Sequence, residues 1–369
     1  MVVNYLCTIL LSTTWNVSPD GDGSQSLVGA LLKARSGDTI LAAPGIYFPG
    51  TKRTDSFKLK KGLTLKGAGE SSVLSGEIGN DGIEDNSYHV VIGAQNSTLV
   101  GFTITGGNAN GQTIPTVKDA LKKANQWPPT QSRGRSRQSF SEPQVDAKGG
   151  GMRNDGIVMT IEDCLFEYNN AIYGGGMYNT NEANITITNC KFIRNSAKEG
   201  GGMYNYNLSS PTIDSCVINT NTASRGGGMM NRYASSPTIT NSQFVTNHAT
   251  VHGGAICNDY GASPQIQNVA IWQNTSDGDG GGIFTDDTAS QFGKTVPRIT
   301  SCNFMDNIAA NNGGAIANYN KCSPAIELST FAKNEAKSGG AISNRLGATA
   351  QITQCEFFAK TDTVESNKQ

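Results

Sequence analysis

Four ionisable side chains occupy the same position in consecutive repeats of this chain, directly before a pair or triplet of glycines. They recur at steps of 26 or 27 residues: Glu199, Arg225, His252 and Asp279. Stacked on neighbouring coils, a carboxylate, a guanidinium, an imidazole and a second carboxylate could carry out general acid/base chemistry on a glycan. These four are therefore the candidate catalytic residues.

Their spacing separates the enzymatic interpretations from a structural one. Glu199 and Asp279 would lie three coils apart, about 14 Å at the roughly 4.8 Å separation of paired strands, whereas a hydrolase pair needs roughly 5–9.5 Å. A polysaccharide lyase needs a base and a group that neutralises a carboxylate, which Arg225 and His252 could supply. We favour a solvated corner of mixed charge without catalysis, and keep a polysaccharide lyase or glycoside hydrolase as the alternative.

A second set of side chains could bind sugars, because aromatic rings beside charged groups stack on sugar rings and bond their hydroxyls. These residues follow the Met or Ile of each glycine motif or stand in the turn beyond it: Tyr178, Tyr204, Tyr206, Arg232, Tyr233, Asp259, Tyr260 and Phe284. We expect them to form one outward face that binds ligand. The alternative is that an outward tyrosine merely suits a strand.

A calcium site is the only cofactor site that the sequence suggests, and its signal is weak. Four aspartates could converge on Ca²⁺ around the irregular repeat at 275–303: Asp277, Asp279, Asp286 and Asp287. Asp277-Gly-Asp279-Gly begins like a calcium loop, but the full loop pattern is absent. No phosphate-binding loop, dinucleotide fingerprint, nucleophile elbow or HExxH motif is present.

A glycine motif written eight times predicts the element that must position these side chains. GGGMRN at 149–154 returns in variant forms that begin at Gly174, Gly200, Gly226, Gly253, Gly280, Gly313 and Gly339. A fixed period in this range predicts a solenoid whose repeats bury their apolar faces against their neighbours. Helical repeats are excluded, because 44 glycines would destabilise helices.

Each repeat contains three short strand-like segments separated by Gly, Asn, Ser and Pro, which predicts one triangular coil of a parallel β-helix. The fold is therefore an all-β, right-handed parallel β-helix of about a dozen coils. In register, the Met/Ile of the glycine motif and the Phe/Ile of a Phe/Ile-x-x-Asn motif become two inward apolar ladders. Two columns of asparagine follow them, and we expect these amides to bond from coil to coil.

Five of the eight cysteines share one column, two residues before the Phe/Ile position: Cys164, Cys190, Cys216, Cys302 and Cys355. Side chains one coil apart in such a column point the same way, and their Cβ atoms exceed the roughly 3.8 Å that a disulfide prefers. We expect small, buried, mostly free thiols. A zinc site is not expected, because no Cys-x-x-Cys pair is present.

Residues 14–369 are predicted to form a single β-helix domain, with a cap and first coil at 14–50, an inserted loop at 107–148 and regular repeats at 149–358. A helix at 26–36 should cover the open end of the first coil. Residues 1–13 are a signal segment or a capping strand, with neither favoured. A net charge of −1 with 16% charged residues argues against a nucleic-acid partner, and no apolar run is long enough to span a membrane.

The opening SPDGDGSQSLVGALLKARSGDTILAAPGIY (18–47) resembles the cap and first coil of secreted right-handed parallel β-helix proteins of the pectate-lyase-like superfamily. The GGAI and FxxN tetrapeptides resemble the repeats of chlamydial polymorphic outer-membrane proteins. The resemblance implies surface display and adhesion. We therefore expect an extracellular or cell-surface scaffold that binds a polysaccharide or a surface protein, while its ligand and oligomeric state stay open.

Overall fold

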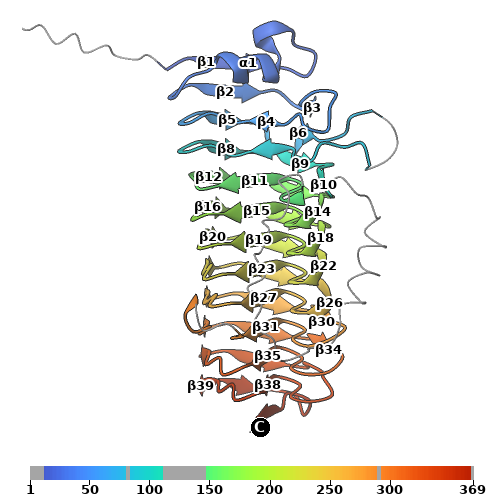
Figure 1. Ribbon diagram of the computed structural model, residues 1–369, viewed down its shortest axis with the longest axis vertical. Coiled ribbons are helices and arrows are strands. Elements are labelled where there is room, and N and C mark those ends of the chain that lie inside the picture. The colour runs from blue at the N-terminus through green and yellow to red at the C-terminus, as the bar shows by residue number, and fades with distance from the viewer. Residues whose placement is uncertain (1–11, 80–83, 111–146, 289–291, 367–369) are drawn as a thin grey trace, which may run out of the picture.

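The computed structural model describes residues 12–79, 84–110, 147–288 and 292–366. Across these ranges the backbone winds through about 12 coils that stack along one axis in the order of the sequence (Figure 1). Neighbouring coils are joined by parallel strand pairs from the first coil to the last. The predicted all-β parallel solenoid is confirmed, and its handedness stays a prediction.

A coil begins with a strand of one sheet, here called the A sheet, and continues into a strand of a second sheet, the B sheet. Within the described residues, the A sheet contains β1 (Thr14–Val17), β2 (Thr39–Ala42), β5 (Thr64–Lys66), β8 (Thr98–Val100), β12 (Val158–Glu162), β16 (Asn184–Thr188), β20 (Thr212–Asp214), β24 (Thr238–Thr240), β28 (Gln265–Gln267), β32 (Arg298–Thr300), β36 (Ala325–Glu327) and β39 (Gln351–Thr353). The B sheet contains β3 (Gly45–Tyr47), β6 (Ser72–Ser75), β9 (Thr103–Thr105), β13 (Leu165–Glu167), β17 (Lys191–Ile193), β21 (Val217–Asn219), β25 (Gln243–Val245), β29 (Ala270–Trp272), β33 (Asn303–Met305), β37 (Thr330–Ala332) and β40 (Glu356–Phe357).

The other two sheets meet at the glycine motif. The C sheet contains β4 (Phe57–Lys58), β7 (Val91–Ile92), β11 (Met152–Asp155), β15 (Met177–Thr180), β19 (Met203–Tyr206), β23 (Met229–Arg232), β27 (Ile256–Asp259), β31 (Ile283–Asp286), β35 (Ile316–Tyr319), β38 (Ile342–Asn344) and β41 (Val364–Ser366). The D sheet contains β10 (Asn108–Ala109), β14 (Asn170–Tyr173), β18 (Ser196–Glu199), β22 (Thr222–Arg225), β26 (His248–His252), β30 (Thr275–Ser276) and β34 (Ile308–Ala309).

The D sheet is a fourth side that the sequence did not predict. Its strands follow the asparagine of the FxxN motif and turn a small side chain inward, as Ala171, Ala197 and Ala223 do. Segments of two to five residues rich in Ala, Ser and Asn carry little strand propensity, so they looked like turns. Pairing with the equivalent segment of the next coil makes them strands.

The predicted apolar ladders fill the interior. Met152 pairs with Met177 and Met177 with Met203, all with almost no exposed surface. The Phe166 and Phe192 rings stack with their centroids 4.7 Å apart and 3° between their planes. Each coil thus buries the apolar face of the one before it, as the repeat period requires.

Both asparagine columns are buried hydrogen-bonded ladders. Asn179 Nδ2 donates to Asn205 Oδ1 at 2.8 Å, and Asn205 Nδ2 donates to Asn231 Oδ1 at 2.8 Å. In the second column, Asn195 Nδ2 donates to Asn221 Oδ1 at 3.0 Å. Apart from Asn154 Oδ1 and Asn318 Oδ1, which have no hydrogen-bond partner in the described ranges, these amides bond from coil to coil, which confirms the structural role predicted for the columns.

The cysteine column is confirmed as well. Cys164 N donates to Cys190 Sγ at 3.4 Å, and Cys216 N donates to Ser242 Oγ at 3.0 Å. A serine hydroxyl thus replaces the cysteine sulfur as the acceptor of the backbone N–H. The cysteines of the described ranges are free thiols, and all are buried except Cys355, which is half-buried.

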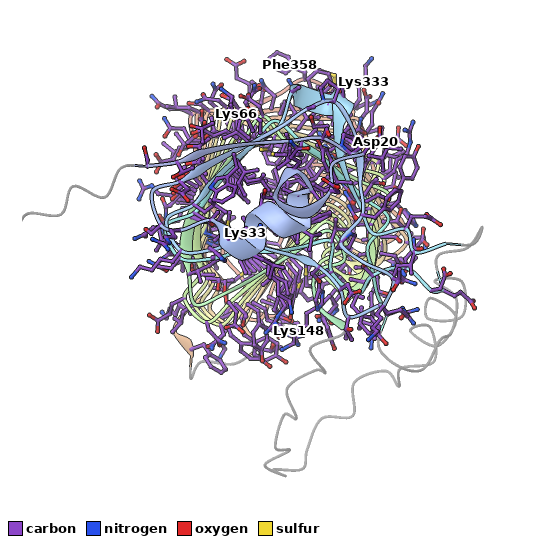
Figure 2. All side chains as sticks on the ribbon, turned by 90° about the horizontal axis from the view of Figure 1, so that it is seen from above. Asp20, Lys33, Lys66, Lys148, Lys333 and Phe358 are labelled. Atoms are coloured by element: carbon purple, nitrogen blue, oxygen red, sulfur yellow. The ribbon has the colours of Figure 1, made fainter. Side chains whose placement is uncertain are left out.

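The helix α1 (Leu27–Lys33) lies across the end of the first coil (Figure 2). Ser26 caps it by accepting a hydrogen bond from Gly29 N, and Leu27, Ala30 and Leu31 join the core. It is shorter than the predicted 26–36, because Ala34 already has an extended ψ of 151°. Two short 3₁₀ helices, η1 (Gly23–Gln25) and η2 (Gly69–Ser71), complete the elements of the described ranges. The structure does not describe residues 1–11 of the predicted segment 1–13. It also does not describe residues 111–146 of the predicted insertion 107–148.

Candidate functional site

The D and C strands of each coil meet at a tight glycine corner, which brings three columns of side chains together outside the core. Gly200 adopts a left-handed φ of 67°, and a Cβ on Gly201 would stand 2.4 Å from Gly227 O. Only glycine therefore fits where successive corners stack. The columns are two walls and a floor, and we call the whole arrangement the corner trough.

The first wall is the column that directly precedes the glycines. Glu199 pairs with Arg225, Arg225 with His252, and His252 with Asp279 in parallel register. The predicted stacking of these four candidate catalytic residues on consecutive coils is therefore confirmed, whereas a catalytic role stays a prediction.

The floor of the trough is made by the second residue of each C strand. It holds an apolar cluster of Tyr178, Tyr204, Met230, Cys257, Phe284 and Ala317. Tyr178, Tyr204 and Phe284 are only 1%, 2% and 4% exposed. The prediction that these three rings form an open surface for stacking on sugars is wrong.

The two walls bury the floor by pairing across it. The second wall is the last residue of the C strands, and its Arg232 Nη1 lies 3.1 Å from Glu199 Oε2 of the first wall. Arg225 Nη1 lies 3.3 Å from Asp259 Oδ2. Further along, Asn312 Nδ2 donates to Asp279 Oδ1 at 2.7 Å. The two ion pairs link a residue of the first wall to a residue of the second wall one coil further on, so they close over the aromatic floor, whereas the Asn312–Asp279 bond runs along the first wall.

Asp259 is the most unusual carboxyl of the trough. Burial raises its pKa to about 7, although the Arg232 and Arg225 guanidinium groups act in the opposite direction. Its Oδ1 has no hydrogen-bond partner in the described ranges, so burial is incompletely compensated. Below neutral pH this carboxyl therefore holds a proton.

His252 is a neutral imidazole packed against the floor. Its ring stacks on Phe284 with centroids 4.1 Å apart and 7° between the planes. Burial, reinforced by the positive charge of Arg225, lowers its pKa to about 3. Nδ1 lies 3.5 Å from Asp279 Oδ2. A base with so low a pKa abstracts protons weakly, which argues against the lyase role predicted for His252.

The accessible aromatic surface lies at the second wall of the trough, where Tyr206 ends β19 in register with Arg232, and at the turn that follows this wall. Tyr206, Tyr233 and Tyr260 come from three successive coils and are half-buried, and Phe292 is 36% exposed. Ring centroids are 5.1 Å apart for Tyr206–Tyr233, 5.0 Å for Tyr233–Tyr260 and 4.8 Å for Tyr233–Phe292. The Arg232 guanidinium lies 4.7 Å from the centroid of Tyr260. We call these four rings the aromatic corner.

The predicted ligand-binding set thus divides in two. Tyr206, Arg232, Tyr233 and Tyr260 line the aromatic corner or its edge, whereas Asp259 and the three floor rings are buried. Sequence reasoning missed Phe292, which lies in the long step between Ile283 and Ile316 and belongs to no column. The lengthened step was the only signal that could have pointed to it.

The four aspartates proposed for calcium do not converge. Within the described ranges, no group of three Asp, Glu, His or Cys side chains is placed to hold a metal ion. Asp279 accepts from Asn312, Asp286 accepts from Asn320 Nδ2 at 2.6 Å, and Asp287 accepts from Thr295 Oγ1 at 3.1 Å. Neighbouring amides and hydroxyls satisfy these carboxylates separately, which corrects the calcium prediction.

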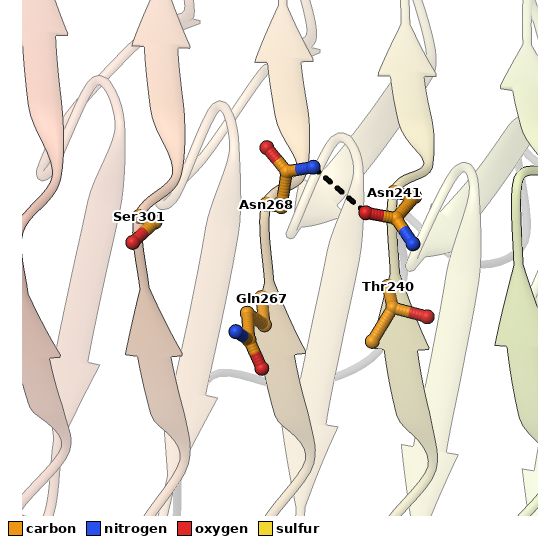
Figure 3. A pocket seen from close by; sticks show the side chains of 5 residues that line it. All are labelled: Thr240, Asn241, Gln267, Asn268 and Ser301. Carbon is orange, nitrogen blue, oxygen red and sulfur yellow. Dashed lines mark hydrogen bonds between the residues drawn. The ribbon is translucent and has the colours of Figure 1, made fainter.

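A polar depression of about 510 Å³ lies on another part of the surface, at the turn between the A and B sheets (Figure 3). It is lined by Thr240, Asn241, Gln267, Asn268 and Ser301. No candidate from the sequence falls here.

No protein-family model matches this chain, and no curated protein is similar to it in sequence. Similar solved structures include a polygalacturonase from Erwinia carotovora ssp. carotovora, at 12% identity and a TM-score of 0.48, covering 96% of this chain and 94% of that one. The Streptococcus pneumoniae surface protein and adhesin PfbA gives 10% and 0.46, covering 90% and 92%. Pectate lyase Pel9A gives 12% and 0.44, covering 95% and 79%. At these values the likeness assigns no activity to this chain.

In the described part of the chain, no helix is both long enough and apolar enough to cross a membrane.

Proposed function

We propose that this chain is a secreted or cell-surface β-helix that binds a glycan through the aromatic corner and the charged edge beside it. The observation that carries the proposal is the set of rings on successive coils, with Arg232 packed against Tyr260. Half-buried rings with a fixed guanidinium offer both stacking and charged hydrogen bonds to a sugar chain. A surface protein that presents an aliphatic or cationic side chain is the other partner class for the same rings.

Extracellular display and an adhesin-like role belong to this proposal. Their support is the likeness of the GGAI and FxxN repeats to those of chlamydial polymorphic outer-membrane proteins, together with a fold that presents one long face to a partner. The nearly neutral net charge of −1 suits a protein that avoids unspecific binding to polyanions.

Binding is favoured over catalysis because both carboxyl groups of the first wall already have partners. Glu199 is held by Arg232, and Asp279 by Asn312. A substrate would have to break these bonds before it reached either carboxyl. A polysaccharide lyase or hydrolase stays the second candidate, since a buried carboxyl with a pKa near 7, as in Asp259, is typical of catalytic acids.

The binding proposal is tested by a glycan array read with the parent chain and with Tyr233→Ala and Tyr260→Ala. We expect both variants to lose most of the signal for any glycan that the parent chain binds. Tyr168→Ala is the matched control, because Tyr168 is an exposed tyrosine with the same left-handed backbone, φ 52° against 54° and 53°, on a different turn. Equal signals from all four proteins would refute the aromatic corner.

The enzymatic alternative has its own test. Release of unsaturated uronate products from pectate, alginate or glycosaminoglycans would be followed by absorbance, with and without Ca²⁺. Products that disappear in Asp259→Asn would replace the binding proposal with a lyase.

A further inference from the structure

The turn between the A and B sheets carries a third ladder, which is distinct from the two inside the coil. Its residues all have left-handed backbone with φ between 49° and 54°: Asp163, Asn189, Ser215, Asn241, Asn268, Ser301 and Leu328. Asparagine tolerates this conformation better than most residues. Asn241 Nδ2 donates to Asp214 Oδ1, and Asn268 Nδ2 donates to Asn241 Oδ1, each at 2.7 Å. Each amide therefore donates to the coil before it.

The ladder is interrupted at Ser215, whose hydroxyl donates to Asp214 Oδ2 at 2.9 Å, and it stops again at Ser301, one coil beyond Asn268. Figure 3 shows the amide nitrogen of Asn268 directed at Asn241 and its carbonyl oxygen on the side of Ser301. A serine side chain is too short to supply the next amide. No hydrogen bond to Asn268 Oδ1 or from Ser301 Oγ is present within the described ranges. An acceptor and a hydroxyl are thus left facing the missing rung.

The polar depression lies beside this missing rung. Its volume of about 510 Å³ falls in the range of roughly 300–1,000 Å³ that small-molecule sites occupy. Thr240, Asn241, Gln267, Asn268 and Ser301 bring hydroxyls and amides and no ionisable group, so a neutral ligand suits it. Leu328, at the next corner, is exposed and apolar.

We infer that this depression binds the acetamido group of an N-acetylated amino sugar. The acetamido N–H would donate to Asn268 Oδ1 and continue the ladder in the direction in which its own amides donate. The acetamido carbonyl would accept from the Ser301 hydroxyl, and its methyl group would lie toward Leu328. The Gln267 amide remains for the ring hydroxyls, whereas the Thr240 hydroxyl already donates to Asp214 Oδ1 at 2.6 Å. The site lies on a different turn from the aromatic corner and does not depend on it.

The ligand class is tested by saturation-transfer NMR on the full chain with three probes: chitotetraose, cellotetraose and N-acetyl-lysine amide. We expect strong transfer to the acetyl methyl protons of chitotetraose and none to cellotetraose, which has the same backbone without acetamido groups. Equal transfer to cellotetraose would overturn the acetamido assignment. Equal transfer to N-acetyl-lysine amide would overturn the assignment to a sugar.

The site is tested by Ser301→Asn, which supplies the missing rung within the fold's own pattern. We expect the variant to keep or raise the melting temperature and to weaken chitotetraose binding at least tenfold. Ser215→Asn is the matched control, because Ser215 stands in the same column with φ 54° but does not line the depression. It should bind as the parent chain does.

A comparison with Tyr260→Ala distinguishes binding at the depression from binding at the aromatic corner. Tyr260→Ala should leave chitotetraose binding unchanged, since its ring belongs to the aromatic corner. If Ser301→Asn still binds chitotetraose, the inference is overturned, whatever happens at the aromatic corner. If Tyr260→Ala alone abolishes binding, the sugar occupies the aromatic corner and the depression is not its site.

Discussion

At the scale of single residues, Asp259 is placed where ionisation costs most. Its carboxyl is buried between two guanidinium groups, yet burial outweighs them and raises its pKa to about 7. A carboxyl of this kind holds its proton in the folded state at pH values where the unfolded chain has lost it. The folded state therefore loses this part of its stability as the pH rises from about 4 to about 7.

Asp259→Asn, which mimics the protonated form, should remove this pH dependence. The free energy of unfolding of the parent chain should fall relative to that of the variant between pH 4 and pH 7. The difference changes by at most about 1.4 kcal/mol per pH unit, and nearby charges reduce it. Urea unfolding of both proteins at pH 4, 5.5 and 7 measures it. A difference that is constant over this range would show that Asp259 is ionised throughout.

At the scale of elements, the asparagine ladders hold neighbouring coils at one spacing. Asn205→Ala should leave a donor on Asn179 and an acceptor on Asn231 unpaired inside the protein. Each buried unsatisfied group costs about 1–3 kcal/mol, so we expect the two together to cost about 2–6 kcal/mol by chemical denaturation. Asn184→Ala, an exposed asparagine on β16, is the control and should cost under about 1 kcal/mol. Equal losses would show that the ladder adds nothing beyond ordinary side-chain contacts.

The cysteine column makes a second element-scale prediction. Burial raises the pKa of the Cys302 thiol to about 11, and the pKa of Cys190 is also raised, chiefly by its bond to Cys164. Thiolates do the reacting, so Cys164, Cys190 and Cys216 should label only after unfolding. Mass spectrometry after native and denaturing alkylation checks this, with half-buried Cys355 as the internal positive control. Rapid native labelling of these three cysteines would mean that the strand register is wrong by one residue.

The effect of a substitution in that column depends on whether it buries a neutral polar group or a charge. Cys190→Ser should be mild, because Ser242 already plays the same part for Cys216. Cys190→Asp places a charge in the core without a partner and should unfold several coils. Far-UV circular dichroism and the melting temperature distinguish the two, and similar melting temperatures would contradict the inward column.

At the scale of the whole molecule, a solenoid needs its ends covered, since each coil rests only on its neighbours. α1 covers the first coil with Leu31, which is 5% exposed, while the adjacent Leu32 is 74% exposed. Leu31→Lys should lower the melting temperature and promote self-association by uncovering the end. Leu32→Lys is the same change one residue away and should do neither. Light scattering during thermal unfolding compares them, and identical traces would mean that α1 is not needed as a cover.

Much of this architecture was predictable because the chain repeats. A period of 26 or 27 residues places Phe166 over Phe192 and Asn179 over Asn205, and the interior then follows from one coil. Inward and outward sides alternate along each strand, so the pattern also placed the cysteines and the column of Glu199 and Arg225. These features depend on contacts between equivalent residues, which a one-dimensional repeat contains.

What only the tertiary structure decided are contacts between residues that are not equivalent. Tyr178 and Phe284 point out of the coil, as the sequence predicted, yet the D sheet stands beside them and its charged side chains pair across the trough above them. Strand alternation determines the direction in which a side chain points, but it does not determine which side chains of a neighbouring sheet cover it. The same reason hid the aromatic corner, where Phe292 of an irregular coil meets Tyr233. The depression beside Ser301 forms only once the turns are stacked, because its lining residues come from three coils.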